Sequence, residues 1–246
     1  LNTFDGHVTY AAVAEAFGYS PEELDQANRK AISLMAELRD QYQEEVSTIV
    51  ISGCVGPQDD GYNPAGKLSA DQATGYHSTQ IGTFAETDAD MVTAITMTYY
   101  DEAIGVTRAA QRVGLPAAVS FTLETDGKLP SGQALGEAIE ETDAATDGGP
   151  AYYMINCAHP THFDGVLDPD EPWAQRIRGL RANASTRSHV ELDEADELDA
   201  GDPADLTPPA AVCRTGRSGV IGVPVRGQDQ RPRLPKCVSI MAGIAD

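Results

Sequence analysis

Two kinds of segment alternate along the chain, and this alternation is the feature that most limits its fold. Short runs rich in β-branched and aromatic residues are separated by longer stretches with Ala, Glu and Leu at amphipathic helical spacing. Such an order predicts parallel strands joined by crossover helices, and therefore an α/β protein. The predicted strands are 48–53, 89–97, 116–123, 151–157 and 179–185, and the clearest predicted helices are 20–43, 101–114 and 132–146.

Local signals support the helix boundaries and favour one α/β architecture. Ser20, followed by Pro21 and Glu23, is typical of a helix start, and Ser131 predicts another. No GxGxxG motif follows the first predicted strand and no GxxxxGK[ST] motif occurs, so the nucleotide-binding doubly wound folds lose support. The sequence therefore predicts a (β/α)8 barrel rather than a doubly wound sheet.

Composition excludes several classes of partner. The 246 residues are 41% hydrophobic and 22% charged, which is ordinary for a globular protein, and the formal net charge is −21. Such an acidic balance argues against a nucleic-acid partner, because phosphate binding needs clustered Lys and Arg. No apolar run approaches the roughly 18 residues of a membrane helix, and the first residues lack signal-peptide features. We therefore expect a cytoplasmic protein with no membrane partner, whose oligomeric state the sequence does not determine.

The charge reverses sign near the C-terminal end. Residues 211–246 contain six basic and two acidic residues, together with three prolines, and they lack apolar periodicity. A sharp reversal of this kind usually marks a separate module or tail. We therefore divide the chain into a barrel-like unit, residues 1–206, and an atypical basic tail, residues 207–246.

Polar and sulfur-bearing residues follow the predicted strands, where barrel enzymes carry their chemistry. Cys157 after AYYMIN is the sharpest of these signals. Taken alone, it fits a buried small residue, a nucleophile assisted by His159 or His162, a redox thiol or a zinc thiolate. The other strand-end residues are Gly53, Thr96, Thr122 with Glu124, Asn156 and Asn183.

Four runs together resemble the homocysteine S-methyltransferase family. They are SGCVGPQDDGY (52–62), PAAVSFTLETDGKLPSG (116–132), MINCAHPTHF (154–163) and LRANAS (180–185), and they occur in the family's order and spacing. The resemblance implies a (β/α)8 barrel with one Zn2+ on three cysteine thiolates. It also implies transfer of a methyl group from a sulfonium or similar donor to homocysteine, giving methionine, with a small-molecule thiol and a methyl donor as partners.

The resemblance assigns roles to individual residues. Cys157 matches the first zinc ligand, and Asn156 matches its neighbour in the substrate site. Thr122, Glu124 and Gly53 are the other expected substrate-binding residues, with Glu124 or Asp126 receiving an amino group. An exposed turn at Glu124 and Asp126, and a tight turn at Gly53, are the structural alternatives. Zinc on three protein thiolates keeps a fourth position open for the substrate sulfur.

The sequence departs from the family in three places. No segment of this sequence corresponds to the family's first strand. Ile95-Thr96 stands where many members have Glu-Thr. The family's Gly-Gly-Cys-Cys-Gly segment corresponds to residues 220–232, which contain no cysteine, while Cys213 and Cys237 lie outside it. We therefore expect an incomplete barrel with a doubtful eighth strand and with two of three zinc thiolates missing. A shifted reading frame from about residue 207 onward is our hypothesis for the tail.

Three functions follow as hypotheses. The leading one is zinc-assisted methyl transfer to homocysteine, which makes the chain an enzyme by its family. The second is a non-catalytic, truncated family member without a complete zinc site. The third is a hydrolase that uses Cys157 as its nucleophile and His159 as its base.

Overall fold

The structure is a computed structural model. It describes residues 18–45, 48–62, 64–197, 199 and 201–202, together with the backbone of residues 219–220. Cys213, Cys237 and all of the basic tail except residues 219–220 lie outside the described residues, as does the shifted-frame hypothesis.

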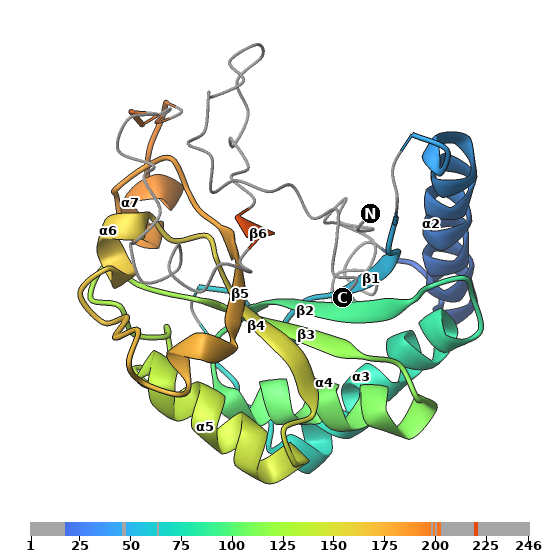
Figure 1. Cartoon of the computed structure of the whole chain (residues 1–246), viewed down its shortest axis with the longest axis horizontal. Helices are drawn as coiled ribbons and strands as arrows, with labels where there is room; N and C mark the ends of the chain where they lie inside the picture. Colours follow the sequence, from blue (N-terminus) through green and yellow to red (C-terminus); the bar gives the residue numbers. More distant parts are fainter. Residues whose placement is uncertain are drawn as a thin grey trace.

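Six parallel strands form one sheet in which spatial order follows chain order (Figure 1). Among the described residues β1 and β6 do not pair, so the sheet is not closed. This arrangement confirms the predicted α/β fold with an unclosed parallel sheet, and the two-residue strand β6 pairs with β5 in the part of the chain where the sequence makes an eighth strand doubtful. The strands are β1 (Ser52–Val55), β2 (Met91–Met97), β3 (Ala117–Thr122), β4 (Pro150–Asn156), β5 (Ile177–Arg181) and β6 (Gly219–Val220).

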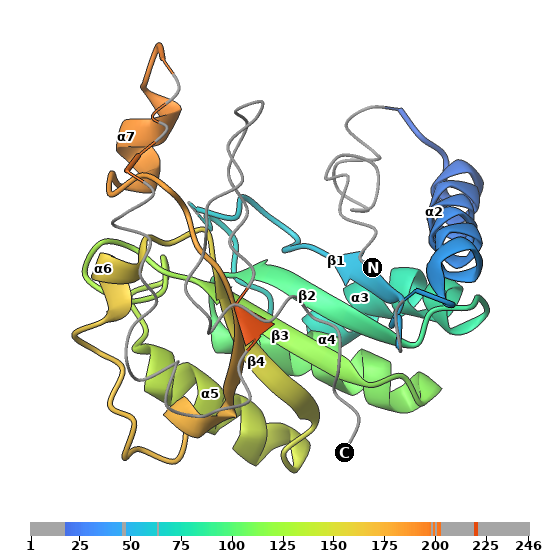
Figure 2. The ribbon, with the colours of Figure 1, turned by 45° about the horizontal axis from the view of Figure 1, so that its top comes forward.

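Long helices cover one face of this sheet. In Figures 1 and 2, α3, α4 and α5 lie along the same face, while α2 stands beside β1. The long helices are α2 (Pro21–Tyr42), α3 (Ala70–Ala85), α4 (Tyr100–Val113) and α5 (Leu135–Thr146). The short elements are α6 (Pro160–Phe163), the 3-10 helix η1 (Ala174–Arg176) and α7 (His189–Asp193). No helix in the described part of the chain is both long and apolar enough to span a membrane.

Caps at the helix ends explain several boundaries. The Ser20 hydroxyl accepts from the Glu23 backbone N–H and the Glu23 carboxylate accepts from the Ser20 N–H, so α2 begins with the predicted capping box. Gly114 ends α4 in the left-handed region with φ +76°. The predicted start at Ser131 is wrong, because its hydroxyl bonds to Gln133 and α5 begins four residues later.

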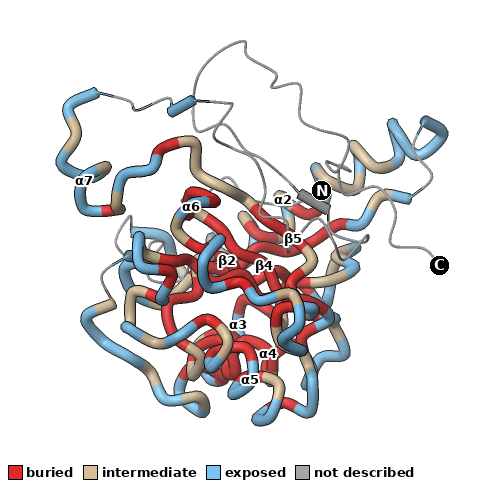
Figure 3. The backbone as a smooth tube through the Cα atoms, turned by 60° about the vertical axis from the view of Figure 1, so that its left-hand side comes forward, coloured by how far each residue is buried: buried red, intermediate tan, exposed pale blue. Residues whose placement is uncertain are grey.

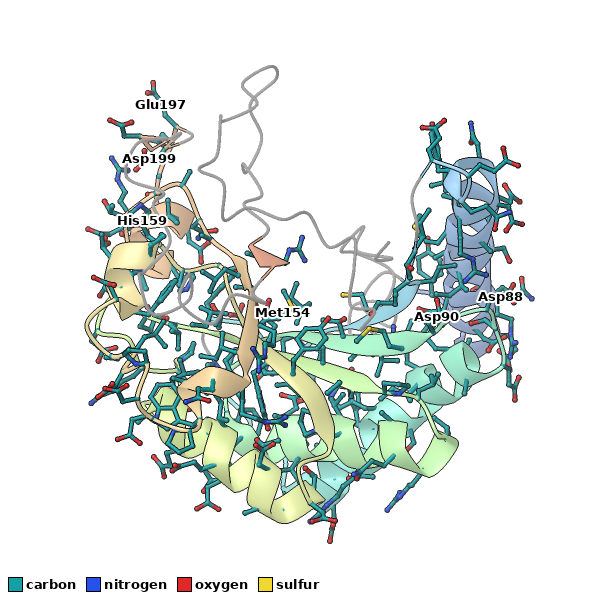
Figure 4. The ribbon with its side chains drawn as sticks, viewed as in Figure 1. Asp88, Asp90, Met154, His159, Glu197 and Asp199 are labelled. Carbon is teal, nitrogen blue, oxygen red and sulfur yellow. The ribbon has the colours of Figure 1, made fainter. Side chains whose placement is uncertain are left out.

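The alternation of side chains separates the two faces of the sheet. Val92, Val119 and Ile155 belong to the large apolar core beneath the helices. The intervening residues point to the opposite face, where Ala118, Tyr152 and Met154 form a second, smaller cluster. Figure 3 shows that burial is concentrated in the strands and the helices beneath them, and Figure 4 shows Met154 at the middle of the sheet. The helix-covered face therefore carries most of the core.

The acidic run at residues 191–202 is helical only at its beginning among the residues that the structure describes. The α7 helix starts at a capping box on Ser188 and ends at Asp193, and the described residues after it are not helical. Asp199 instead accepts from the Ser185 hydroxyl at 2.8 Å and pairs with Arg187 at 3.3 Å. Repeated like charges repel one another, and without an apolar face a longer helix would bury no apolar surface to stabilise it. Side-chain hydrogen bonds and ion pairs therefore determine the backbone conformation here.

Candidate functional site

The strand-end residues predicted to carry chemistry gather at one edge of the sheet. Thr122 and Asn156 are the last residues of β3 and β4, and Cys157 follows immediately. Figure 4 shows His159, just beyond β4, at the opposite end of the sheet from Asp88 and Asp90, which precede β2. The C-terminal ends of the parallel strands therefore share one end of the molecule.

Asn156 ties three strands together through both ends of its amide. Its Oδ1 accepts from the Ser120 hydroxyl at 2.6 Å and from the Thr96 backbone N–H at 3.0 Å. Its Nδ2 donates to the Thr96 hydroxyl at 2.9 Å, and the residue is fully buried. These bonds hold Thr96 at φ +60°, a conformation that a β-branched residue rarely adopts. The amide thus orients two neighbouring strand ends.

Cys157 leaves its strand in a left-handed conformation with φ +54°. Its N–H donates to the Arg181 carbonyl at 3.0 Å, and its own carbonyl accepts from the Asn183 side chain at 3.1 Å. Both partners belong to β5 or the segment after it, so that neighbouring segment holds the strained residue in place. The side chain is half-buried, and its sulfur lies near the Tyr62 hydroxyl, close enough to help raise the pKa of that hydroxyl.

Tyr62 reaches Cys157 from the loop between β1 and α3. Burial of its hydroxyl, and then the neighbouring Cys157, raise the pKa of Tyr62 above its ordinary range. The ring stacks on His189 with centroids 4.1 Å apart and planes 25° apart. Although the hydroxyl is buried, the residue as a whole is 37% exposed, so the ring also meets solvent. Tyr62 therefore connects the thiol to the surface of the site.

His189, the first residue of α7, joins this group to the end of β3. Its Nε2 lies 3.3 Å from the Leu123 carbonyl and 3.5 Å from the Thr122 hydroxyl. Burial lowers the pKa of His189, while the nearby charge of Glu124 acts in the opposite direction. The uncharged imidazole is accordingly favoured at neutral pH. Segments after β1, β3, β4 and β5 thus meet around one thiol.

Sequence reasoning did not single out Tyr62 or His189. Tyr62 ends the family-like run 52–62, so that run carried a signal for it. His189 stands in a polar segment with no strand-end motif of its own, and only the fold places it over Tyr62. The contact joins residues more than a hundred positions apart, which local patterns do not predict.

Gly53 and Glu124, two of the expected substrate-binding residues, lie outside the group of side chains around Cys157 that is described above. A Cβ on Gly53 would lie 2.5 Å from the Phe84 ring, so close packing of α3 on β1 accounts for this glycine. Glu124 is half-buried on a turn in which its N–H donates to the Lys128 carbonyl. The exposed Asp126 accepts from the Lys128 N–H at 3.0 Å, which fits its structural alternative.

The two histidines after β4 take part in local bonds. The His159 Nδ1 accepts from the Thr161 N–H at the start of α6, and His159 is fully buried. His162 bonds through Nε2 to the Thr186 carbonyl at 2.9 Å. Both contacts hold the loops around the site in place.

The described residues do not by themselves form a zinc site. They include two cysteines, Cys54 buried within β1 and Cys157 at the strand end. Within the described ranges no group of three or more His, Cys, Asp or Glu side chains is arranged to hold a metal ion. A single thiolate does not supply the donor set of a structural or catalytic zinc site.

Comparison with known proteins places the chain in a family. The profile of the homocysteine S-methyltransferase family matches residues 2–210. Homocysteine S-methyltransferase 1 of Arabidopsis thaliana is 24% identical over 181 residues, an alignment covering 65% of this chain and 55% of that protein. The chain thus spans about half the length of this curated relative.

Solved structures show the same fold. The metallated form of the Escherichia coli homocysteine methyltransferase MmuM has a TM-score of 0.65 at 16% identity, covering 89% of this chain and 72% of that one. Its oxidized form has a TM-score of 0.61 at 19% identity, covering 85% and 69%. Together with the profile match over most of the sequence, this shows that the chain belongs to the homocysteine S-methyltransferase family.

Proposed function

We propose that the protein transfers a methyl group from a sulfonium-type donor to the thiol of homocysteine, giving methionine. The observation that carries this proposal is the position of Cys157. It stands in a strained conformation at the end of a parallel strand, against Tyr62 and among polar strand ends. This is where barrel enzymes of many kinds hold their substrates.

The reaction needs little beyond a positioned thiolate and an activated methyl group. The acceptor thiol loses its proton to solvent water, and the resulting thiolate attacks the methyl carbon in line and forms a new S–C bond. The donor S–C bond breaks, its electron pair stays on the donor sulfur, and a neutral thioether leaves. Because the donor cation is already activated, proximity and orientation supply much of the rate.

The described residues include groups that could bind the amino group of homocysteine. Ile95, buried in β2, stands where many family members have an acid, so that position offers no carboxylate. Glu124 supplies a half-buried carboxylate one strand further on, near His189, whose Nε2 lies 3.5 Å from the Thr122 hydroxyl. We assign Glu124 and Thr122 to the substrate amino group, with Asn156 fixing the strand ends around them. Backbone close to Gly53 is the remaining proposed contact.

The zinc ion that the family resemblance implies is a separate matter. Cys157 is its proposed ligand, but the described residues lack the other two thiolates, so no step is derived through the metal. The same observation favours the second candidate function, a family member without catalytic activity. The hydrolase hypothesis has weaker support, because the Cys157 sulfur contacts Tyr62 while the His159 ring is engaged at the start of α6.

The test is an assay of methionine formation from homocysteine. Zinc is supplied in the reaction mixture, and the product is detected by mass spectrometry. S-methylmethionine, S-adenosylmethionine and betaine are offered separately as donors, the last being an ammonium rather than a sulfonium. We expect methionine with a sulfonium donor and a loss of about 100-fold or more in Cys157→Ala. Cys54→Ala is the matched control, since Cys54 is the other described cysteine and lies inside β1.

Each contrary result selects an alternative. No methionine with any donor supports the non-catalytic chain. Ester hydrolysis by zinc-free protein, lost in Cys157→Ala, supports the hydrolase. Equal methionine formation by Cys157→Ala and the unmodified chain would remove Cys157 from the mechanism.

A further inference from the structure

A buried pair of ionisable residues lies between α3 and α4, away from the strand ends. Their close approach begins with Gly105 of α4, where a Cβ would lie 2.3 Å from the Ala73 Cβ of α3. His77 lies one turn from Ala73, and Glu102 lies one turn from Gly105, so both point into the same interface. The His77 Nε2 is 2.9 Å from the Glu102 Oε1, and each side chain is only 1% exposed.

The Glu102 carboxylate serves as a common acceptor. The same Oε1 accepts from the Gln58 backbone N–H at 2.7 Å. Burial, and then the nearby Glu102 charge, raise the pKa of the Tyr99 hydroxyl. Because a carboxylate only accepts, His77 must present its Nε2 as the donor. The carboxylate also lies in the first turn of α4, where the helix dipole favours negative charge.

These bonds fasten both ends of the β1–α3 loop, which comprises residues 56–69 and is described except at residue 63. Gln58 at its beginning donates directly to Glu102. Leu68 near its end donates its N–H to the Tyr99 hydroxyl at 2.9 Å, and that hydroxyl lies near the Glu102 carboxylate. One buried carboxylate therefore holds the two ends of a loop whose middle crosses the strand ends.

The middle of the loop has its own internal bonds and carries Tyr62. Asp59 accepts from the N–H groups of Ala65 and Gly66 at 3.0 and 2.9 Å, and these backbone bonds lower its pKa. A Cβ on Gly61 would lie 2.8 Å from the Thr96 methyl group, so the loop rests directly on the end of β2. The loop is therefore ordered by its own hydrogen bonds, and the positions of its two ends determine the position of Tyr62.

We propose that Glu102 and His77 are positioning residues, which hold the β1–α3 loop so that Tyr62 stays against the Cys157 thiol. The pair is too deeply buried to touch a substrate, so its effect on the site passes through the loop. The proposal rests on the proposed function only in taking Cys157 as the centre of the site. Its test measures thiol protection and needs no methyl transfer, so the two proposals fail separately.

The experiment is alkylation of the native full chain with N-ethylmaleimide, resolved for each cysteine by mass spectrometry. Glu102→Gln keeps the side-chain volume and one acceptor oxygen, but it replaces the carboxylate with a neutral amide and so weakens the bonds from Gln58 and His77. We expect Cys157 to react about five-fold faster or more, because the loop opens more often. Arg108→Gln is the matched control: it breaks an exposed contact to Asp71 between the same two helices, and the Cys157 rate should not change.

A double-mutant cycle separates positioning from general destabilisation. Tyr62→Ala should itself expose Cys157, and adding Glu102→Gln to it should produce no further increase. An equal increase by Glu102→Gln with and without Tyr62, or no increase at all, would overturn the proposal. Cys54, fully buried in β1, reports whether the sheet stays folded. If Cys54 becomes alkylated in Glu102→Gln, the cycle is repeated with Tyr99→Phe in its place. Tyr99→Phe removes only the hydrogen bond at the Leu68 end of the loop.

Discussion

Two regions of the molecule differ in how their strands are covered: the first comprises β1 to β4 with their helices, and the second comprises β5 with α7. The strands β1 to β4 are backed by α3, α4 and α5, which have 16, 14 and 12 residues and bury a continuous apolar core. The strand β5 is followed by α7, which has five residues and one buried side chain, His189. The first region supplies the packed framework, whereas the second contributes a ring that lies on the site. The candidate site therefore depends on how firmly the second region is held to the first.

The largest effect should separate the two regions by stability. Phe84 is fully buried between α3 and β1, so Phe84→Ala should lower the free energy of unfolding by about 3–5 kcal/mol. Val190 on α7 is 64% exposed, and Val190→Ala should change it by about 0.5 kcal/mol or less. Urea unfolding measures both values. Comparable losses would show that α7 is packed as tightly as the first region.

Next in size is the tie between strand ends at Asn156. Asn156→Ala removes three hydrogen bonds and leaves buried polar partners, which should cost about 2–3 kcal/mol of unfolding free energy. Asn183→Ala removes one bond to the Cys157 carbonyl and should cost about 1 kcal/mol. The comparison is again made by urea unfolding. Equal losses would mean that Asn156 does not organise the strand ends.

Arg176 links the two regions directly. Its guanidinium binds both oxygens of Asp143 on α5 at 2.9 Å, donates to the Pro150 carbonyl and lies over the Tyr153 ring. Arg176→Lys loses the two-pronged geometry and should cost about 1–2 kcal/mol in urea unfolding, a modest value because both groups are partly exposed. Arg178→Lys, two residues further along the chain in β5, should cost about 0.5 kcal/mol or less. A larger loss in Arg178→Lys would contradict this account of the junction.

The smallest effect is a pH dependence at the same junction. Burial, and then the hydrogen bond to Asp143, raise the pKa of Tyr153 above its ordinary range. Above about pH 10 the unfolded chain therefore binds fewer protons than the folded chain, and stability falls as pH rises. This residue should remove about 1 kcal/mol between roughly pH 9 and 11. Unfolding free energies across that range should fall less steeply in Tyr153→Phe, and parallel curves would refute the assignment.

Sequence patterns located the framework better than the site. Strands 89–97, 116–123 and 151–157 were predictable because apolar β-rich runs lie between helices, and they match β2, β3 and β4 closely. The helix at 70–85 was not among the clearest predicted, since its sequence is rich in polar residues and its core contacts emerge only on packing. The predicted residues Thr122 and Asn156 do end their strands, and Cys157 follows β4, at one edge of the sheet.

The rest of the site depends on contacts between distant segments. Tyr62 meets His189 because the loop after β1 and the segment after β5 cross the same strand ends. His77 meets Glu102 because a glycine allows α3 and α4 to approach closely. Neither pair has a spacing in the sequence that would reveal it. Backbone geometry in three dimensions supplies that information.

The most direct test of the site is whether methionine, the product of the proposed reaction, protects Cys157. Methionine has no thiol to consume the reagent, so the alkylation rate of Cys157 can be followed as its concentration rises. Our account predicts that methionine slows alkylation of Cys157 by about three-fold or more at saturation, leaves Cys54 unaffected, and protects poorly in Glu124→Ala. An alkylation rate at Cys157 that stays constant at every methionine concentration would contradict the placement of the acceptor at this strand end.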